Sequence, residues 1–367
     1  MKGCLRTVLV LLVALRWEST LHAASPAEGS DSGAAGANIA VLVEGDVSVK
    51  RKGWATYEPV PFGTNLRAGD LVRVNPSSHA KVVCSDLTVH ELPNGVAGVP
   101  CNPTRNVLRS KDGSVINVTR SGPPDGSYPV VLMPRRTKLL SPYPTVQWSP
   151  IVGVDAYAVA IRGSQFFWAI RHSGTQFVYP ASAPPLRPGV DYKLIVQAGD
   201  RSSSEEPGVG LGFSILDGKE RAGVEKEQQR IESLGLPDGT AQFLIASLYA
   251  ANGLRAEAIQ RLEVISTQLK VAAVPRLMGD LYMEVGLIRQ AEASYLKALD
   301  LCKAENDNEG LMVIHLALAN IYENALGNNR LAKEHLHATL ELANTIGDET
   351  TIDQAGKRLE RLKKEGV

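Results

Sequence analysis

The sequence carries no excess of charge of either sign. Its 367 residues include 39 lysines and arginines and 39 aspartates and glutamates, which cancel to a formal net charge of zero. A protein that holds nucleic acid or an anionic membrane through bulk charge needs a surplus of basic residues. The composition therefore argues against nucleic acid as a partner.

Recognised catalytic signatures are also missing. The sequence contains no Gly-x-Ser-x-Gly elbow, no phosphate-binding loop and no His-Glu-x-x-His pair. The glycine-rich run at 208–212 leads into a predicted strand, so no helix N-terminus follows it to hold a phosphate. His335 and His337 are two residues apart on a predicted helix, where their side chains point to different sides and cannot share a metal ion. We therefore expect no enzymatic activity, no metal site and no cofactor.

Apolar runs that could cross a membrane are missing beyond the N-terminal region. Lys2 and Arg6 precede an apolar run at 7–15, and Ala23 and Ala24 follow it. A basic start, a short apolar run and small residues at its exit are typical of a secretory signal peptide. The run is short for a bilayer-spanning helix, and a retained membrane anchor is the alternative interpretation. We expect residues 1–23 to be a signal peptide and the mature chain, without a transmembrane segment, to be periplasmic, cell-envelope associated or secreted.

Cysteine is scarce, with four residues in the chain. Cys4 falls in the predicted signal peptide. Cys84 and Cys101 lie close together in a region without a helical pattern, and the oxidising compartment that export implies favours a disulfide between them. A zinc site would need two more ligands nearby, and none is evident. Cys302 lies on a predicted helix, where we expect it to be a small packing residue.

Short β-branched runs separated by turn residues begin at residue 38, after a flexible lead-in rich in Ser, Gly and Ala at 24–37. This pattern predicts a small all-β unit over 38–120. Its motifs resemble the extracytoplasmic FecR-type domain, and the residues that carry the resemblance are Glu44-Gly45-Asp46-Val47-Ser48-Val49, Trp54, Pro59-Val60, Gly63, Leu66, Gly69-Asp70, Val72-Arg73 and Ala80 to Asp86. The resemblance implies a β module outside the cytoplasm. The chain lacks the cytoplasmic segment and central transmembrane helix of signal-transducing FecR proteins, so a role in controlling a sigma factor is not expected.

A second β unit is predicted over 129–217, after a joint rich in proline and glycine. Several runs alternate apolar and polar residues, which is typical of half-buried strands. Trp148 comes early, and Tyr192 opens the penultimate strand. This order is similar to an immunoglobulin or fibronectin type III-like β-sandwich with its tyrosine corner.

The remainder of the chain switches to helical periodicity. Strong helix formers predict a connecting helix at 218–236, and a charged, amphipathic stretch predicts a capping helix at 348–367. Between them, Tyr249, Tyr282 and Tyr322 recur after 33 and 40 residues. Glycine and small residues follow at matching offsets: Gly253, Ala258, Leu262 and Ile265; Gly286, Ala291, Tyr295 and Ala298; and, one residue later, Gly327, Ala332 and Leu336.

This repeat resembles tetratricopeptide (TPR) repeats over 237–345, the third with an extended first helix. The sequence thus predicts a multidomain β plus α protein, with a small all-β FecR-like domain, a fibronectin type III-like β-sandwich and a C-terminal α-helical TPR solenoid. The TPR resemblance implies a concave groove lined by the first helix of each repeat. By register, the groove residues are Phe243, Ser247, Ala250, Arg276, Asp280, Met283, Glu284, Leu316, Asn320, Glu323 and Asn324.

The groove chemistry narrows the class of partner. TPR domains that clamp a C-terminal carboxylate use a set of basic residues and asparagines, whereas Ser247 and Asp280 stand at two of those positions here. Arg276 together with Asp280, Glu284 and Glu323 suits a peptide of mixed or basic character. We therefore expect an exported, non-enzymatic interaction scaffold of the cell envelope that binds a protein or peptide partner in the TPR groove.

The alternative hypothesis is a module that binds the cell wall or another glycan. In that case the FecR-like and sandwich domains would hold peptidoglycan or a related polymer, and the repeats would only stiffen the molecule. Such binding needs exposed aromatic side chains, for which the candidates are Trp54, Tyr57, Phe166, Phe167 and Trp168.

Overall fold

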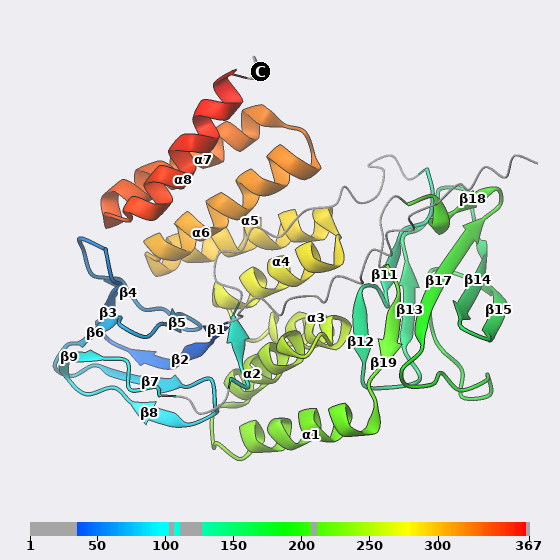
Figure 1. Ribbon diagram of the computed structural model, residues 1–367, viewed down its shortest axis with the longest axis horizontal. Coiled ribbons are helices and arrows are strands. Elements are labelled where there is room, and N and C mark those ends of the chain that lie inside the picture. The colour runs from blue at the N-terminus through cyan, green and yellow to red at the C-terminus, as the bar shows by residue number, and fades with distance from the viewer. Residues whose placement is uncertain (1–34, 103–105, 111–126, 207–210, 365–367) are drawn as a thin grey trace, which may run out of the picture. The chain divides into compact units, whose positions relative to one another are not determined.

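The strands of this chain precede its long helices, as Figure 1 shows. The computed structural model describes residues 35–102, 106–110, 127–206 and 211–364. In these residues the β-sheets lie between residues 35 and 215, and eight α-helices follow between residues 218 and 364. This confirms the expected multidomain combination of β and α parts. The predicted signal peptide and most of the predicted lead-in lie outside the described residues.

The first β unit consists of two four-stranded antiparallel sheets. One has the order β5 (Asn65–Leu66), β2 (Asn38–Glu44), β7 (His79–Val83) and β8 (Val89–Glu91). The other has the order β4 (Glu58–Pro59), β3 (Val47–Lys50), β6 (Leu71–Val74) and β9 (Gly95–Gly98). Because side chains alternate along a strand, the valines of β3 and β6 point into one core with Val82 of β7. A short pair, β1 (Ala35–Gly36) and β10 (Arg109–Ser110), completes the unit.

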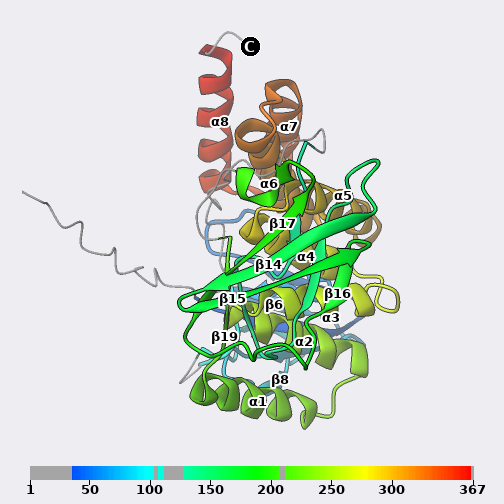
Figure 2. The same cartoon turned by 90° about the vertical axis from the view of Figure 1, so that its right-hand side faces the viewer.

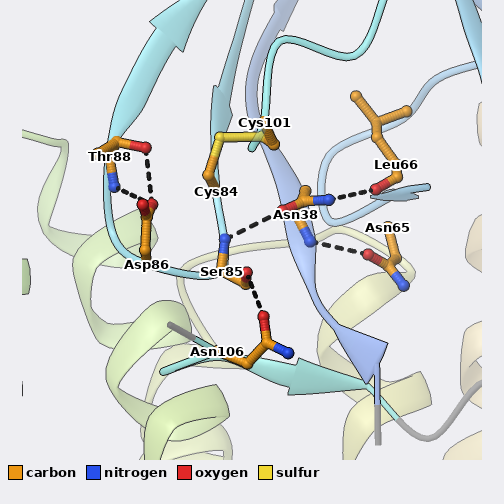
Figure 3. Close-up of a disulfide and its surroundings, with 9 residues drawn as sticks. All are labelled: Asn38, Asn65, Leu66, Cys84, Ser85, Asp86, Thr88, Cys101 and Asn106. Atoms are coloured by element: carbon orange, nitrogen blue, oxygen red, sulfur yellow. Dashed lines mark hydrogen bonds between the residues drawn. A yellow bond between two sulfur atoms is a disulfide. The ribbon is translucent and has the colours of Figure 1, made fainter. Parts of the chain in front are cut away.

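A disulfide joins Cys84, just after β7, to Cys101 (Figure 3). This confirms the predicted pairing. The adjacent backbone is held by Asn38, whose Nδ2 donates to the carbonyl of Leu66 at 2.9 Å and whose Oδ1 accepts from the N–H of Ser85 at 3.0 Å. The two cysteines are 17 residues apart, and a disulfide that closes a loop of this length stabilises the fold by roughly 3 kcal/mol, because it lowers the conformational entropy of the unfolded chain.

The second β unit has two sheets. A three-stranded sheet has the order β11 (Val131–Met133), β13 (Thr145–Trp148) and β16 (Gln176–Val178). The larger sheet has the order β12 (Thr137–Leu139), β19 (Phe213–Ile215), β17 (Asp191–Ala198), β14 (Ala156–Gly163) and β15 (Phe166–Ser173), with β18 (Arg201–Ser202) paired to β17. Figure 2 shows β14, β15 and β17 side by side.

The core of this unit is rich in aromatic rings. Trp148, Tyr157, Tyr179 and Tyr192 are almost fully buried. The hydroxyl of Tyr192 accepts a hydrogen bond of 2.7 Å from the N–H of Arg187, a few residues upstream. This geometry is that of a tyrosine corner, in which a buried ring fixes the entry to a strand.

The helices pack as consecutive neighbours along the chain. They are α1 (Gly218–Glu232), α2 (Asp238–Ala251), α3 (Arg255–Ile265), α4 (Ala273–Val285), α5 (Ile288–Glu305), α6 (Asn308–Asn320), α7 (Asn329–Ile346) and α8 (Glu349–Lys364). Small residues allow the close approach: a Cβ atom on Gly279 would lie 2.6 Å from the ring of Tyr295. A π-helical turn at Ile321–Ala325 extends α6. Such a turn holds one extra residue, which explains why the third set of matching positions slips by one.

The first β unit packs on the helices through buried contacts. The guanidinium of Arg51 lies 2.6 Å from the carboxylate of Asp70 and 2.7 Å from that of Glu309, at the start of α6. Trp54 is 7% exposed and packs in a small apolar cluster with Met312, Ala343 and Ile346. These residues therefore bind a β module to α6 and α7.

The second β unit packs on the helices in a similar way. Arg135 forms a fully buried pair with Glu206 at 2.6 Å and donates to the carbonyl of Val285 at the end of α4. The N–H of Lys138 donates to the carbonyl of Gly253, which precedes α3, at 2.9 Å. The two sheets of this unit share one core, and we call the unit the sandwich. It is thus fixed at the turn between α2 and α3 and at the last turn of α4.

Candidate functional site

Three of the predicted groove residues lie on one face of α4. Arg276, Asp280 and Glu284 follow at intervals of four residues, so their side chains stand one above another. Arg276 contacts the carbonyl of Gly63 in the first β unit at 3.5 Å. At the other end of the row, Glu284 accepts a 2.5 Å hydrogen bond from the Nε of Arg255. The row therefore runs from the first β unit toward the sandwich.

Asp280, in the middle of this row, is hydrogen-bonded to a side chain of the neighbouring helix. Its carboxylate accepts a 2.6 Å hydrogen bond from the hydroxyl of Tyr295 on α5. Burial raises the pKa of Asp280 to about 6, against the opposing effects of the Tyr295 hydrogen bond and of Arg276. Burial also raises the pKa of Tyr295 well above its usual value. The two groups form a structural hydrogen bond between the helices of one hairpin.

Phe243, Ser247 and Met283 are buried in the described structure. The ring of Phe243 lies 5.3 Å from that of Phe62 in the first β unit, in an edge-to-face arrangement. The hydroxyl of Ser247 donates to the carbonyl of Phe243 at 2.9 Å. The first β unit thus covers the α2 end of the predicted groove.

At the α6 end of the predicted groove, Asn320 is buried and Leu316 is partly buried against the helical core. Asn324 is exposed, and its Nδ2 donates to the Oδ1 of Asn320 at 2.6 Å. Glu323 is paired with Arg358 at 2.7 Å and also with Arg361, both on α8. Val313, which the sequence analysis did not select, is 41% exposed. The sequence offered little reason to select Val313, because an apolar residue in a helix usually belongs to the core. The one available signal was its helical spacing from the predicted groove residues Leu316, Asn320 and Asn324.

A cavity of about 800 Å³ lies where the larger sheet of the sandwich meets α3 and α4. Five basic side chains and two carboxylates line it, which gives the lining a net charge of +3. The charged residues are Arg136, Lys138, Arg162, Lys193 and Arg255 together with Asp191 and Glu284. The predicted groove residue Glu284 is therefore also part of this cavity.

The register of the strands explains why these charges share one face. Lys138 and Asp191 each pair with Ser214, and Arg162 pairs with Lys193. Their neighbours along each strand point into the core. Because side chains alternate, all of these polar residues stand on the outer face of the sheet. Lys138, Asp191, Lys193 and Arg162 are exposed, so the cavity opens to solvent.

Some of the charges in the cavity have partners. Arg255 pairs with Glu284, and the Nζ of Lys138 lies 2.6 Å from the carboxylate of Glu220. Burial, followed by repulsion from Arg135, lowers the pKa of Arg136. A guanidinium whose charged form is disfavoured by its surroundings gains from a nearby anion. The arrangement can bind an anionic group.

The aromatic residues proposed for glycan binding divide into two groups. Trp54 is buried against the helices, and Phe166 and Trp168 pack on Tyr192 and Tyr179 in the sandwich. The ring of Tyr57 is covered by the guanidinium of Arg73 at 3.7 Å. Phe167 is 64% exposed, and its ring lies 5.6 Å from the guanidinium of Arg162.

The residues that the structure describes show neither a metal site nor a membrane-spanning helix. Among them, no group of three or more His, Cys, Asp or Glu side chains is placed to hold a metal ion. Within the same residues, no helix has the length and apolar character needed to cross a membrane. Cys302 is buried, with its Sγ 3.7 Å from the carboxylate of Asp307.

Comparison with known proteins gives little. No family model matches the chain, and no curated protein matches it. Among solved structures, a β-1,2-glucanase from Parabacteroides distasonis is similar over 77% of this chain and 49% of its own, at 11% sequence identity. The chain therefore spans about half the length of that protein. The TM-score is 0.19, which carries no argument about fold or function.

Proposed function

We propose that this chain is an exported, non-enzymatic interaction scaffold of the cell envelope. Its parts would be a FecR-like domain, a fibronectin type III-like sandwich and a TPR solenoid, and the helices would bind a protein or peptide partner. The observation that carries the proposal is the accessible surface at the α6 end of the predicted groove. There Val313 on α6 is 41% exposed, and Asn324 in the π-helical turn that follows is exposed.

The charges in the groove indicate how such a partner is recognised. Glu284 and Glu323 already pair with Arg255 and with the arginines of α8. A basic peptide would have to displace these internal partners, which offsets much of its gain. Apolar contact at Val313 has no such cost. The exposed amide of Asn324 donates one hydrogen bond to Asn320 and has further donor and acceptor capacity. We therefore propose a partner recognised mainly through apolar and amide contacts.

The proposed location outside the cytoplasm is supported by the disulfide between Cys84 and Cys101. Structural disulfides persist in oxidising compartments and are rare in the cytosol. The attachment of both β units to the helices suits a scaffold: Arg51 pairs with Glu309 on α6, and Arg135 donates to the carbonyl of Val285 on α4.

A matched pair of variants tests the proposal. Val313→Glu introduces a charge on the proposed face, and Val264→Glu introduces the same charge at a 65% exposed position on α3. Affinity capture from the envelope fraction of the producing cells should recover the same partner with the unmodified protein and with Val264→Glu. Val313→Glu should lose it, while circular dichroism shows unchanged helix content. Equal recovery with both variants would refute binding on this face.

A further inference from the structure

We propose that the basic cavity binds a carboxylated saccharide, with Phe167 as the surface on which one sugar ring packs. The site differs from the α6 face proposed for a protein partner. It lies on the outer face of the sandwich sheet, and its ligand is of a different chemical class. Either proposal can therefore fail without the other.

Charge is the first argument. The lining has five basic residues against two carboxylates. Two of the basic residues have carboxylate partners, Arg255 with Glu284 and Lys138 with Glu220, and the lining keeps an excess of positive charge. The volume of about 800 Å³ lies within the range of roughly 300–1,000 Å³ that is usual for ligand pockets. The planar guanidinium of arginine matches a carboxylate with two parallel hydrogen bonds. Arg136 and Arg162 bring such groups to the cavity.

The second argument is the line of side chains across the sheet. Phe167, Arg162 and Lys193 are direct cross-strand partners on β15, β14 and β17. Strands lie about 4.8 Å apart, so the line from Phe167 to Lys193 spans about 10 Å. An exposed ring at one end and cations along the line fit an extended ligand that has an apolar face and negative groups.

The third argument separates a saccharide from an acidic peptide. Asp191 and the hydroxyl of Ser214 lie among the cations and can accept hydrogen bonds. Sugar hydroxyls donate to such acceptors, whereas ionised acidic side chains have no hydrogen-bond donor to offer them. The C–H face of a pyranose ring also packs well on an exposed aromatic ring, which a glutamate side chain does not. The mixture of acceptors, cations and one exposed ring therefore favours a sugar acid.

The test is isothermal titration calorimetry with the intact mature protein. The probes are a galacturonic acid oligomer and a peptidoglycan glycan strand freed of its peptides, both of which carry carboxylates on sugar rings. The controls are a neutral galactose oligomer, poly-glutamate and inorganic phosphate. The variants are Arg162→Gln, Lys193→Gln and Phe167→Ala, with Arg330→Gln at an exposed position on α7 as the matched control.

We expect at least one carboxylated saccharide to bind and the neutral oligomer not to bind. Each of the three site variants should weaken binding by roughly tenfold or more, with Arg330→Gln unchanged. Higher salt should weaken binding further. Failure of both carboxylated saccharides to bind, or equal affinity in Arg162→Gln, would overturn the proposal. Poly-glutamate binding that is insensitive to Phe167→Ala would assign the cavity to acidic peptides, and binding of phosphate alone would reduce it to a simple anion site.

Discussion

The carboxyl group of Glu257 should make the stability of the protein depend on pH in a predictable way. Glu257 lies on α3 at the contact with the sandwich, where its Oε1 accepts a 2.8 Å hydrogen bond from the N–H of Leu140. Within the described residues its Oε2 is buried and has no hydrogen-bond partner. Burial raises the pKa of Glu257 to about 7, against the smaller effect of the backbone hydrogen bonds.

The sign follows from proton linkage. A carboxyl with a raised pKa in the folded state binds its proton more tightly when folded than when unfolded. Its contribution to stability is therefore present below the unfolded pKa of 4.5 and is lost as the pH rises through about 7. Between pH 5 and pH 8 this one group should lower the free energy of unfolding by about 2.5 kcal/mol.

The perturbation that isolates this effect is Glu257→Gln. Glutamine keeps an oxygen for the N–H of Leu140 but cannot ionise. Urea unfolding at pH 5 and at pH 8 gives the free energies of unfolding of both proteins. The free energy of unfolding of the variant minus that of the unmodified protein should increase by about 2.5 kcal/mol from pH 5 to pH 8. A difference that stays constant across this range would refute the assignment of a buried, uncompensated carboxyl at this contact.

Three further predictions concern packing and can be measured by urea unfolding. Trp54→Ala should lower the free energy of unfolding by about 3–5 kcal/mol, because a nearly buried ring is removed from the cluster with Met312. Phe167→Ala, at an exposed position, should change it by less than about 1 kcal/mol. Similar losses in the two variants would mean that Trp54 does not anchor the β unit. Gly279→Ala should lower the free energy of unfolding by about 1–3 kcal/mol, because the added methyl group overlaps the ring of Tyr295. Gly356→Ala, which has open space around it on α8, should raise it by up to about 1 kcal/mol. Two effects of the same sign would contradict the close approach of α4 and α5 at Gly279. Arg135→Ala should cost about 3–5 kcal/mol because it leaves Glu206 buried and unpaired, and a loss below about 1 kcal/mol would argue against that burial.

The features that the sequence predicted are local ones. Alternating valines indicated strands, and the order of β before α followed from the change of period. The spacing of Cys84 and Cys101 indicated the disulfide that the structure contains. The tyrosines and small residues of the repeat indicated which helices approach closely, and Gly279 against Tyr295 shows the reason for one of these positions.

The contacts that the sequence did not indicate join residues far apart in the chain. Trp54 lies in a strand-rich region but is buried by α6 and α7, so its exposure could not be judged from its neighbours in sequence. Glu323 is paired with Arg358 on a helix that was expected only as a cap. Two cations of the basic cavity, Arg136 and Lys138, come from one short stretch, but Arg162, Lys193 and Arg255 lie far from it and from one another in the sequence.

One measurement tests the scaffold account most directly. A photo-reactive amino acid placed at Val313, and in a separate protein at Val264, would be activated by light in intact producing cells. Both positions are exposed on helices, so nonspecific reaction should be similar at both. The account predicts one defined cross-linked protein at position 313, competed by unlabelled protein, and none at position 264. The same products at both positions, or no product at position 313, would contradict a partner-binding face on α6.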